Sequence, residues 1–547
     1  MSLFKKSGLF LFLILLLAAF LRFYHLSSIP PSLYSDEIDQ GYNAYSLMLT
    51  GKDEHGSFFP VSLRSFGDWK PPLQTLFMIP SIYLFGLNEF SVRLPSAVLG
   101  LISVYLSYFL INNFSDNYKG RKKIAILTAF IICISPWHIL QSRSAMLVMI
   151  ALFFLELGII FFVTSRNKIS NFYWSIIFFS LSIYSYYGMR IITPFIALLL
   201  IYFWKIKLNT RNWLTSFLIL SLMMLPLLSG FIKNPNVLFG RAKTVSVFYD
   251  QGTNLRLWEL VAQDGTHANS EIVRFFHNKP YLYFKKISQN FFSHFNPKYL
   301  IIEGDGAEPF HTPGIGIIYF LDSIFLIFGL IYLYKYKFPN RNFFVLFLIV
   351  SIIPAALTFM VPSSNRTFNA IFPLSVFIAL GFYWYCAKIK INLLHIIIVL
   401  IYSASFAYFS NVFFLKIPKN YSQIWNYGWR ETVQYTSSLK NKPDNIIVVQ
   451  GEGMPYVYFL FYNKYSPLLF QQKSVRDYKS DRFGFESVSS FDKYIFTSDY
   501  DWQYAKENPM KNSLYIVPES KLKGNEKSVK DINYPNGKIA FKIFRYE

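Results

Sequence analysis

The feature that most constrains the fold of this chain is a series of long apolar runs that recurs along most of its length. A helix needs about 20 apolar residues to cross the hydrocarbon core of a bilayer. Only 15% of the 547 residues are charged, well below the quarter or so that is usual in soluble proteins. We count about eleven candidate spans, which begin near Gly8, Phe90, Lys123, Ala145, Phe172, Ile191, Trp213, Gly314, Phe343, Phe368 and Leu393. The sequence therefore predicts a mainly α-helical, polytopic membrane protein.

The loops between these runs alternate in charge, which predicts their orientation. Every second loop is rich in lysine and arginine, and these basic clusters include Lys5-Lys6, Arg121-Lys122-Lys123, Lys205 with Lys207, Lys335 with Lys337, and Lys388 with Lys390. Basic loops stay on the cytoplasmic side of a membrane. We therefore expect a multi-pass protein of the cell membrane with a cytoplasmic N-terminus. Residues 27–89 would form a first outer loop and 232–313 a second. Topology explains the net charge of +22, so nucleic acid is not an expected partner.

Three apolar segments need separate interpretation. Gly8–Phe23 resembles a signal peptide, but no small-residue cleavage site follows it, so we expect a retained anchor. Pro72–Gly86 is too short for a span and predicts a re-entrant or interfacial helix. In the second outer loop, Tyr281–Lys286 and Phe291–Phe295 predict further interfacial helices.

The chain changes character near residue 415. Residues 1–415 are expected to form the transmembrane domain, and 416–547 a small extracytoplasmic α/β domain. In this tail we predict helices over Tyr421–Lys440 and Pro455–Tyr462, and strands over Ile446–Gln450, Lys493–Thr497, Ser513–Val517 and Ile539–Phe544. Both cysteines, Cys133 and Cys386, lie in apolar runs, so no disulfide framework is expected.

A polar stretch after the first apolar run is the predicted site of chemistry. It reads Leu33-Tyr-Ser-Asp-Glu-Ile-Asp39. Ser35 is a predicted N-cap, with Asp36 and Glu37 in the first turn of a helix that ends near Thr50. We expect this helix to lie on the membrane, with an apolar face made of Ile38, Tyr42, Tyr45 and Leu49.

Adjacent helical residues point about 100° apart, so one acid of the pair should face a given site. We assign Asp36 as the catalytic base and Glu37 as its structural or ion-pair partner in the catalytic site. Both acids could instead simply complement the helix N-terminus. Lys70, with Trp69 beside it and two prolines after it, is expected to bind a lipid phosphate, although interfacial lysines also contact headgroups without any catalytic role.

Three lone arginines fall in short outer loops, where positive charge is usually sparse. Arg143, Arg190 and Arg366 are expected to bind the phosphate of an anionic lipid, with structural pairing to acids as the alternative. Arg93 and His138 are expected to support the site. The sequence has no His-x-x-x-His spacing and no nucleotide fingerprint, so we expect no metal, no cofactor and a donor other than a nucleotide sugar.

Three motifs in the first part of the chain carry a resemblance to a known group of enzymes. These motifs are Asp36-Glu37, Lys70-Pro-Pro-Leu73 and Phe90-Ser-Val-Arg-Leu-Pro-Ser-Ala97. The arrangement resembles the polyprenyl-phosphate-sugar-dependent membrane glycosyltransferases of the GT-C class. This group contains the protein O-mannosyltransferases and the lipid A aminoarabinose transferases and is glycosyltransferase family 39-like. The resemblance is firm over 21–104 and looser through 194.

The resemblance implies a GT-C-like fold that transfers a sugar, with inversion, from a polyprenyl-phosphate donor to an acceptor on the extracytoplasmic face. It implies that Asp36 is the base and that Lys70 contacts the donor phosphate. His138 and Arg190 also match recurring positions of the group. The chain departs from the pattern after Arg143, where no acid follows. A second carboxylate would then come from elsewhere, and the candidates are Glu37, Asp68, Glu303 and Asp305.

Other functions remain open from the sequence. A lipid-linked glycan polymerase or ligase would use a diphosphate-linked donor, and a polyprenyl-lipid transporter would show repeated halves with broken helices. A non-catalytic lipid or partner binder is the third alternative. The expected partners of a transferase are the lipid donor, membrane lipids, and an outer glycolipid, glycan or protein as acceptor.

Overall fold

The computed structural model describes residues 7–114, 118–206, 208–264, 270–306, 309–449, 453–479, 485–497, 502–524 and 526–547. They form two compact units, which we call the helical unit and the sheet unit. The helical unit contains the chain up to Arg22, Leu99–Ser142 and Leu147–Phe409. The sheet unit contains Phe23–Val98, Arg143–Met146 and Ser410–Glu547. These units divide the chain differently from the predicted boundary at residue 415, because most of the first outer loop packs with the C-terminal segment.

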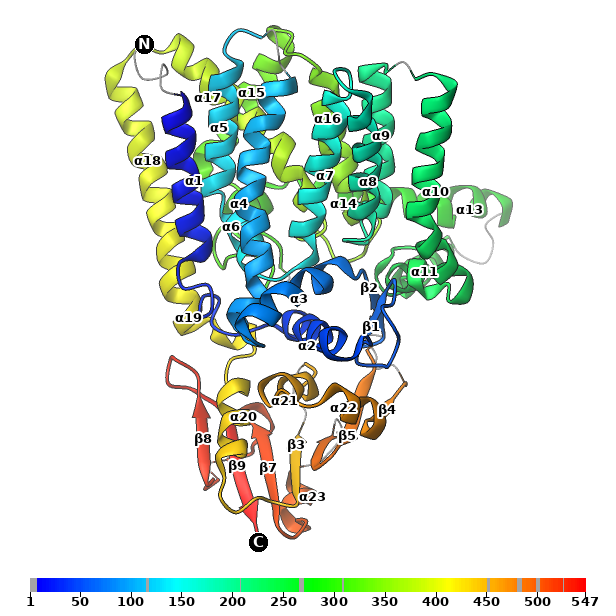
Figure 1. Ribbon diagram of the computed structural model, residues 1–547, viewed down its shortest axis with the longest axis vertical. Helices are drawn as coiled ribbons and strands as arrows, with labels where there is room; N and C mark the ends of the chain where they lie inside the picture. The colour runs from blue at the N-terminus through cyan, green and yellow to red at the C-terminus, as the bar shows by residue number, and fades with distance from the viewer. Residues whose placement is uncertain are drawn as a thin grey trace. The chain divides into compact units, whose positions relative to one another are not determined.

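The helical unit is built from helices, the longer of which run roughly along one direction (Figure 1). Its elements are α1 (Ser7–Phe23), the larger part of α4 (Glu89–Phe114), α5 (Arg121–Ile134), α6 (Pro136–Arg143), α7 (Leu147–Thr164), α8 (Ile169–Ile183), α9 (Met189–Trp204), α10 (Thr210–Lys233), α11 (Asn236–Val245), α12 (Gln251–Gln263), α13 (Ser270–Phe276), α14 (Lys279–Ser293), η2 (Lys298–Ile302), α15 (Phe320–Lys335), α16 (Arg341–Ala356), η3 (Phe368–Ala370), α17 (Ile371–Lys388) and α18 (Asn392–Asn411).

Membrane-spanning character is confirmed by length and composition. In the described residues, five helices are long and apolar enough to cross a bilayer, or six if the bent pair α5–α6 counts as one span. Further apolar helices are shorter, and these are α1, α3 (Leu73–Phe85), α8, α9 and α16. Apart from α3, these helices lie in ten of the eleven predicted runs, and the run that begins near Gly314 contains α15, so the chain is a multi-pass membrane protein. The number eleven stays a prediction.

The bend between α5 and α6, 60° in size, has a local cause. Pro136 lacks an N–H group, so the carbonyl groups at the end of α5 lose a helical donor. The buried Arg22 guanidinium supplies donors instead, with Nη1 3.3 Å from the Cys133 oxygen and Nη2 3.4 Å from that of Ile132. Nη2 also lies 2.8 Å from Nδ1 of His138. A buried arginine therefore stabilises the break.

Helices α15 and α17 pack closely through two glycines. A Cβ atom at Gly329 would overlap the Phe377 carbonyl, and one at Gly381 would overlap the Phe325 carbonyl. Small residues allow this close approach of helix backbones in membrane proteins. The second outer loop contributes shorter helices. The two predicted interfacial helices there are largely one, α14, with Phe284 and Phe292 exposed on its surface.

The sheet unit contains a two-stranded and a seven-stranded sheet. Its elements are α2 (Ser35–Thr50), β1 (Leu63–Ser65), β2 (Asp68–Lys70), α3, η4 (Val412–Lys416), α19 (Ile417–Asn420), η5 (Ser422–Trp425), α20 (Trp429–Ser438), β3 (Asn445–Val449), α21 (Tyr456–Tyr462), α22 (Pro467–Lys473), β4 (Val475–Asp477), β5 (Ser487–Phe491), β6 (Tyr494–Thr497), α23 (Trp502–Glu507), β7 (Ser513–Pro518), η6 (Glu519–Lys521), β8 (Lys530–Asn533) and β9 (Ile539–Tyr546). The larger sheet has the order β4-β5-β6-β3-β7-β9-β8, and β3 pairs in parallel with both β6 and β7 (Figure 1).

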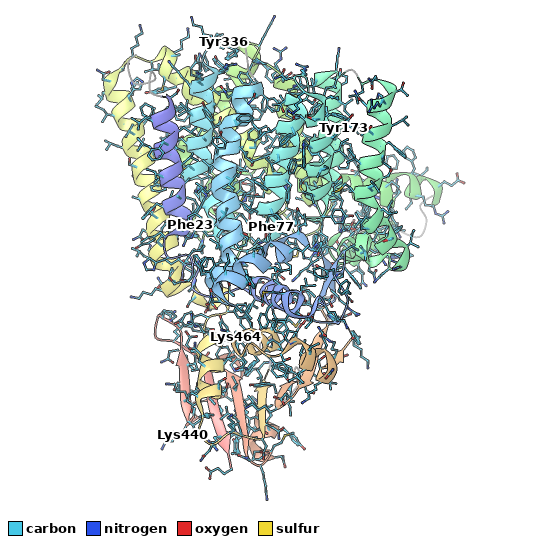
Figure 2. The ribbon with its side chains drawn as sticks, in the orientation of Figure 1. Phe23, Phe77, Tyr173, Tyr336, Lys440 and Lys464 are labelled. Atoms are coloured by element: carbon cyan, nitrogen blue, oxygen red, sulfur yellow. The ribbon has the colours of Figure 1, made fainter. Side chains whose placement is uncertain are left out.

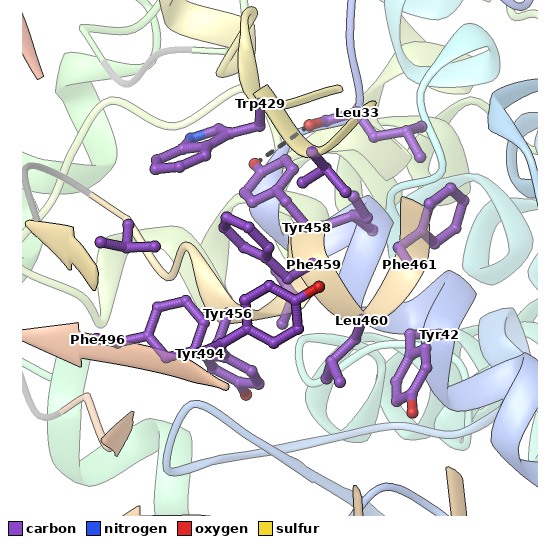
Figure 3. Packing of buried hydrophobic residues seen from close by; sticks show 14 of the residues in the cluster. Leu33, Tyr42, Trp429, Tyr456, Tyr458, Phe459, Leu460, Phe461, Tyr494 and Phe496 are labelled. Atoms are coloured by element: carbon purple, nitrogen blue, oxygen red, sulfur yellow. Dashed lines mark hydrogen bonds between the residues drawn. The ribbon is translucent and has the colours of Figure 1, made fainter. Parts of the chain in front are cut away.

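Apolar side chains cover both faces of the seven-stranded sheet. Along β3, Ile446 and Val448 join one core while Ile447 and Val449 join the other, as the two-residue period of a strand requires. The larger core includes a cluster of aromatic residues on α21, seen in Figure 3. All four predicted strands of the tail are present as β3, β6, β7 and β9.

One predicted helix of this unit differs in the structure, and another is present as expected. The helix expected over Tyr421–Lys440 is interrupted, because Asn426 and Gly428 adopt positive φ angles of 53° and 103°. Helix α20 begins after them. The short helix expected after Pro72 is α3, and it buries Met78 and Ile82 while Phe77 is exposed (Figure 2).

The predicted apolar face of α2 packs in part against protein. Its residues Ile38 and Tyr42 belong to the same core as α21. The Tyr42 hydroxyl donates to the Tyr465 carbonyl at 3.1 Å, and its ring packs edge-on against Phe470. The part of the apolar face made by Ile38 and Tyr42 is therefore buried by the C-terminal segment, whereas Leu49 near the other end of the helix is 54% exposed.

Candidate active site

A tight hairpin carries the predicted phosphate-binding lysine. Strands β1 and β2 are antiparallel, and Ser65 pairs with Asp68. The two-residue connection, Phe66-Gly67, has φ angles of 52° and 83°, as the type I′ turns of such hairpins require. The sequence analysis missed this hairpin because both strands have only three residues. It ends at Lys70, just before the two prolines that precede α3.

The hairpin brings Lys70 to the first turn of α2. The Lys70 Nζ atom lies 2.6 Å from Oδ1 of Asp36 and 3.3 Å from Oδ2 of Asp39. The two acids are three positions apart in the helix, so both project from the same face. The structure therefore brings together the predicted base, the predicted phosphate ligand and a third charged group that the sequence analysis did not assign.

These three charges differ in exposure. The side chains of Lys70 and Asp39 are 8% and 2% exposed, whereas that of Asp36 is 36% exposed. Burial alone would lower the pKa of Lys70, but Asp36 and Asp39 outweigh this effect and raise it. The Phe66 ring lies 4.8 Å from the ammonium group and adds a cation–π contact. Lys70 is therefore a charged amine in a poorly hydrated setting.

Asp39 has a complete set of partners. Its Oδ2 atom accepts from the Ser65 hydroxyl at 2.6 Å, and its Oδ1 atom accepts from the Asn43 amide at 3.2 Å. Burial raises the pKa of Asp39, and Lys70 opposes that shift. The three-residue spacing of Asp36 and Asp39 in a predicted helix is the sequence signal that could have identified Asp39 as part of the site.

Glu37 lies in a separate cluster with Arg93. Its two carboxylate oxygens each lie 3.1 Å from a nitrogen of the Arg93 guanidinium. It also accepts from the backbone N–H groups of Ala145 at 2.8 Å and Tyr34 at 3.0 Å. The second bond closes the start of α2, where the N-cap residue is Tyr34 and not the predicted Ser35. Glu37 is fully buried and serves as an ion-pair partner.

The remaining contacts of Arg93 are also structural. Its guanidinium donates to the carbonyl oxygens of Pro30, at 2.7 Å, and Ser32. The guanidinium carbon lies 5.8 Å from the centre of the Trp425 ring. Arg93 therefore fixes the segment that leads into α2, which agrees with a supporting role.

Arg143 does not have the surroundings expected of a phosphate ligand. It is completely buried, and Nη2 donates to the carbonyl oxygens of Tyr24 and Ile29, both at 2.7 Å. Phe414 lies 5.3 Å from its guanidinium carbon. The outer-loop position suggested an exposed cation, but the side chain folds inward and binds backbone carbonyls.

Three other predicted residues lie in the helical unit. Arg190 donates to the Leu238 carbonyl at 2.9 Å. Arg366 donates to the Thr358 hydroxyl at 2.8 Å and to a backbone carbonyl of the same loop. His138 is the buried partner of Arg22 described above.

The candidate second carboxylates are dispersed. Asp68 lies on the hairpin, where its side chain accepts from the N–H group of Trp69 at 2.8 Å. The partly exposed Trp69 ring lies 5.9 Å from the Arg64 guanidinium. Asp305 accepts from both the backbone and hydroxyl groups of Ser364. Glu303 forms an exposed pair with a lysine. Within the described residues, no group of three or more His, Cys, Asp or Glu side chains could hold a metal ion.

Comparison with known proteins gives one family match and several structural matches. Residues 12–234 match the family described as dolichyl-phosphate-mannose-protein mannosyltransferase. ArnT from Cupriavidus metallidurans in the apo state superposes with a TM-score of 0.51 at 11% identity, covering 95% of this chain and 94% of that chain. The same protein bound to undecaprenyl phosphate gives 0.51 at 10% identity, covering 99% and 98%. No curated protein matches the sequence.

The family match includes the segments that contain Asp36, Lys70 and Arg93. The ArnT comparisons extend the shared fold over almost the whole of both chains. These findings confirm the resemblance to the polyprenyl-phosphate-sugar-dependent glycosyltransferases of the GT-C class: the family model matches residues 12–234, and the ArnT comparisons show a shared fold.

Proposed function

We propose that this enzyme transfers a sugar from a polyprenyl-phosphate donor to an acceptor on the extracytoplasmic face, with inversion at the anomeric carbon. Asp36 is the general base and Lys70 holds the donor phosphate. The acceptor is a glycolipid, a glycan or a protein. The observation that carries this proposal is the contact of 2.6 Å between the half-exposed Asp36 carboxylate and the buried Lys70 ammonium.

In the proposed step, an acceptor oxygen attacks the anomeric carbon as the bond from that carbon to the phosphate oxygen breaks. The bonding electron pair leaves with the polyprenyl phosphate, and the acceptor proton passes to Asp36. Negative charge develops on the departing phosphate. A fixed ammonium group in a poorly hydrated site stabilises such charge better than water does.

The lipids of related proteins support a monophosphate donor. The matched family is named for dolichyl-phosphate-mannose, and one ArnT structure contains undecaprenyl phosphate. Both are polyprenyl monophosphates. Arg190 and Arg366, in the helical unit, are proposed to bind the phosphate of an anionic lipid. Arg143 is not among the proposed contacts, because carbonyl oxygens already occupy its Nη2 group.

The proposed orientation depends on the loop charges. A cytoplasmic N-terminus would leave the loop that contains Asp36 and Lys70, and the C-terminal segment, on the outer side. The variants Ser57→Cys, in the predicted outer loop, and Lys390→Cys, in a predicted cytoplasmic loop, test this orientation. A membrane-impermeant thiol reagent applied from outside should label Ser57→Cys and leave Lys390→Cys unlabelled at the new position.

The reaction is tested with the purified protein in lipid nanodiscs. Radiolabelled polyprenyl monophosphate sugars, diphosphate-linked sugars and nucleotide sugars are supplied separately, with membranes from cells lacking the gene as the acceptor source. We expect label to reach the acceptor from a monophosphate donor alone, with release of polyprenyl phosphate and inverted anomeric configuration. Transfer from the diphosphate donor instead would favour a polymerase or ligase.

A further inference from the structure

Lys70 has two carboxylate partners that are not equivalent. Asp36 lies at the surface of the cluster and makes the shorter contact, whereas Asp39 lies behind it and is almost completely buried. A phosphate group that reaches Lys70 from outside the protein therefore meets Asp36 first. We therefore expect that Asp36 can be displaced from Lys70 without opening the fold, whereas Asp39 cannot.

The neighbours of Asp39 fix it in place. The Ser65 hydroxyl comes from the hairpin and the Asn43 amide from the next turn of α2, so Asp39 joins the two elements that form the cluster. A buried carboxylate that loses its cation would be an uncompensated charge, which is strongly unfavourable. Asp39 and Lys70 are therefore expected to stay paired whatever happens to Asp36.

We propose that Asp39 is a positioning residue, the permanent counter-ion of Lys70, which holds the ammonium group charged and in place while a lipid phosphate displaces Asp36. This inference rests on the proposed function. A phosphate oxygen takes the place of Asp36 on the ammonium group, and the released Asp36 carboxylate becomes available to accept the acceptor proton. No bond other than hydrogen bonds and ion pairs changes in this exchange.

Loss of Asp39 would change the balance within the cluster. Asp36 would become the one carboxylate in direct contact with a buried ammonium and would remain bound to it, so a free base would form less often. The other charged groups near Lys70 are Asp68 on the hairpin and the buried Glu54. Among the described residues, Asp36 and Asp39 are the acids within ion-pair distance of the Lys70 ammonium. Asp68 and Glu54 lie farther away, so neither could replace Asp39 as its counter-ion.

The test compares Asp39→Asn with wild type in nanodiscs, per folded molecule. We expect kcat to fall about tenfold or more, because Asp36 is released less often. The affinity for undecaprenyl phosphate should fall much less than kcat, because the loss of one negative charge near the phosphate offsets the tighter binding of Asp36 to Lys70.

A matched control is Asp477→Asn, which removes a carboxylate from the exposed strand β4 of the same unit and should behave as wild type. A wild-type kcat in Asp39→Asn would overturn the inference. So would an equal loss of kcat and undecaprenyl phosphate affinity, which would indicate a structural role.

Two further variants keep the outcome decisive. If Asp39→Asn does not fold, Asp39→Glu retains the charge and should keep kcat within about threefold of wild type, because the counter-ion of Lys70 is still present. A fall in kcat of about tenfold or more in this folded variant would overturn the inference. Asp36→Asn separates the two claims. Retained transfer in that variant would refute the proposed base, whereas lost transfer there together with a wild-type kcat in Asp39→Asn would refute the exchange alone.

Discussion

Asp36 and Glu37 are adjacent acids with opposite surroundings. Asp36 is half-exposed and contacts one ammonium group, whereas Glu37 is fully buried with a guanidinium and two backbone N–H groups. The helix separates their directions by about 100°, so one acid faces the Lys70 cluster and the other faces Arg93. The contrast separates a group that can exchange partners from a group that holds the helix in place.

The two cations show the same contrast. Arg93 donates to carbonyl oxygens in addition to Glu37, so its guanidinium is fully used within the fold. Lys70 is held by carboxylates, one of which is accessible. An accessible ion pair in a poorly hydrated site is suited to binding an anion. A buried pair whose hydrogen-bonding groups are all occupied instead holds its two segments together, because breaking it would leave a buried charge without a partner.

The largest expected effect comes from breaking the buried pair. Glu37→Gln leaves the Arg93 guanidinium without its counter-charge, which should lower the free energy of unfolding by about 3–5 kcal/mol. Thermal unfolding in detergent measures this loss. The transfer rate per folded molecule should change little. Unchanged stability would show that the Glu37–Arg93 pair does not hold the helix.

The next effect concerns donor binding. Lys70→Met removes a charge-assisted hydrogen-bond donor, so the affinity for undecaprenyl phosphate should fall about 10- to 100-fold. Competition binding in nanodiscs measures it. Lys52→Met, at an exposed position just after α2, is the control and should bind as wild type does. Equal binding by the two variants would contradict the phosphate-binding role of Lys70.

The smallest expected effect tests how firmly Asp39 is held. Ser65→Ala removes a buried hydroxyl that donates to a carboxylate, which should cost about 1.5 kcal/mol or slightly more in unfolding free energy. Ser62→Ala removes a buried hydroxyl that donates to the neutral Lys70 carbonyl, and should cost about 1 kcal/mol. Chemical unfolding curves distinguish the two. A larger loss in Ser62→Ala would contradict the special place of Asp39.

The sequence predicted the parts of this site that depend on short motifs. The pairing of Asp36 with Lys70 followed from an acid and a lysine placed on either side of one loop. The four strands β3, β6, β7 and β9 followed from apolar runs of strand length. The motifs and the strand-length runs are local features, although the contact between Asp36 and Lys70 joins residues 34 positions apart.

The features that the sequence analysis missed depend on contacts between distant segments. The role of Asp39 becomes visible only when the hairpin places Ser65 and Lys70 against α2. Arg143 has an outer-loop position, and nothing in its neighbours along the chain predicted that its guanidinium would bind the carbonyls of Tyr24 and Ile29. The apolar face of α2 had the pattern of an interfacial helix, because burial against protein and burial in lipid select the same residues.

The most direct test of the account is the single-turnover transfer rate of Asp36→Asn, measured per folded molecule with a saturating polyprenyl-phosphate sugar. We predict a fall of about 10²- to 10⁴-fold, with normal thermal stability and retained binding of undecaprenyl phosphate. Transfer at a rate near that of wild type would contradict the assignment of Asp36 as the base and with it the proposed mechanism.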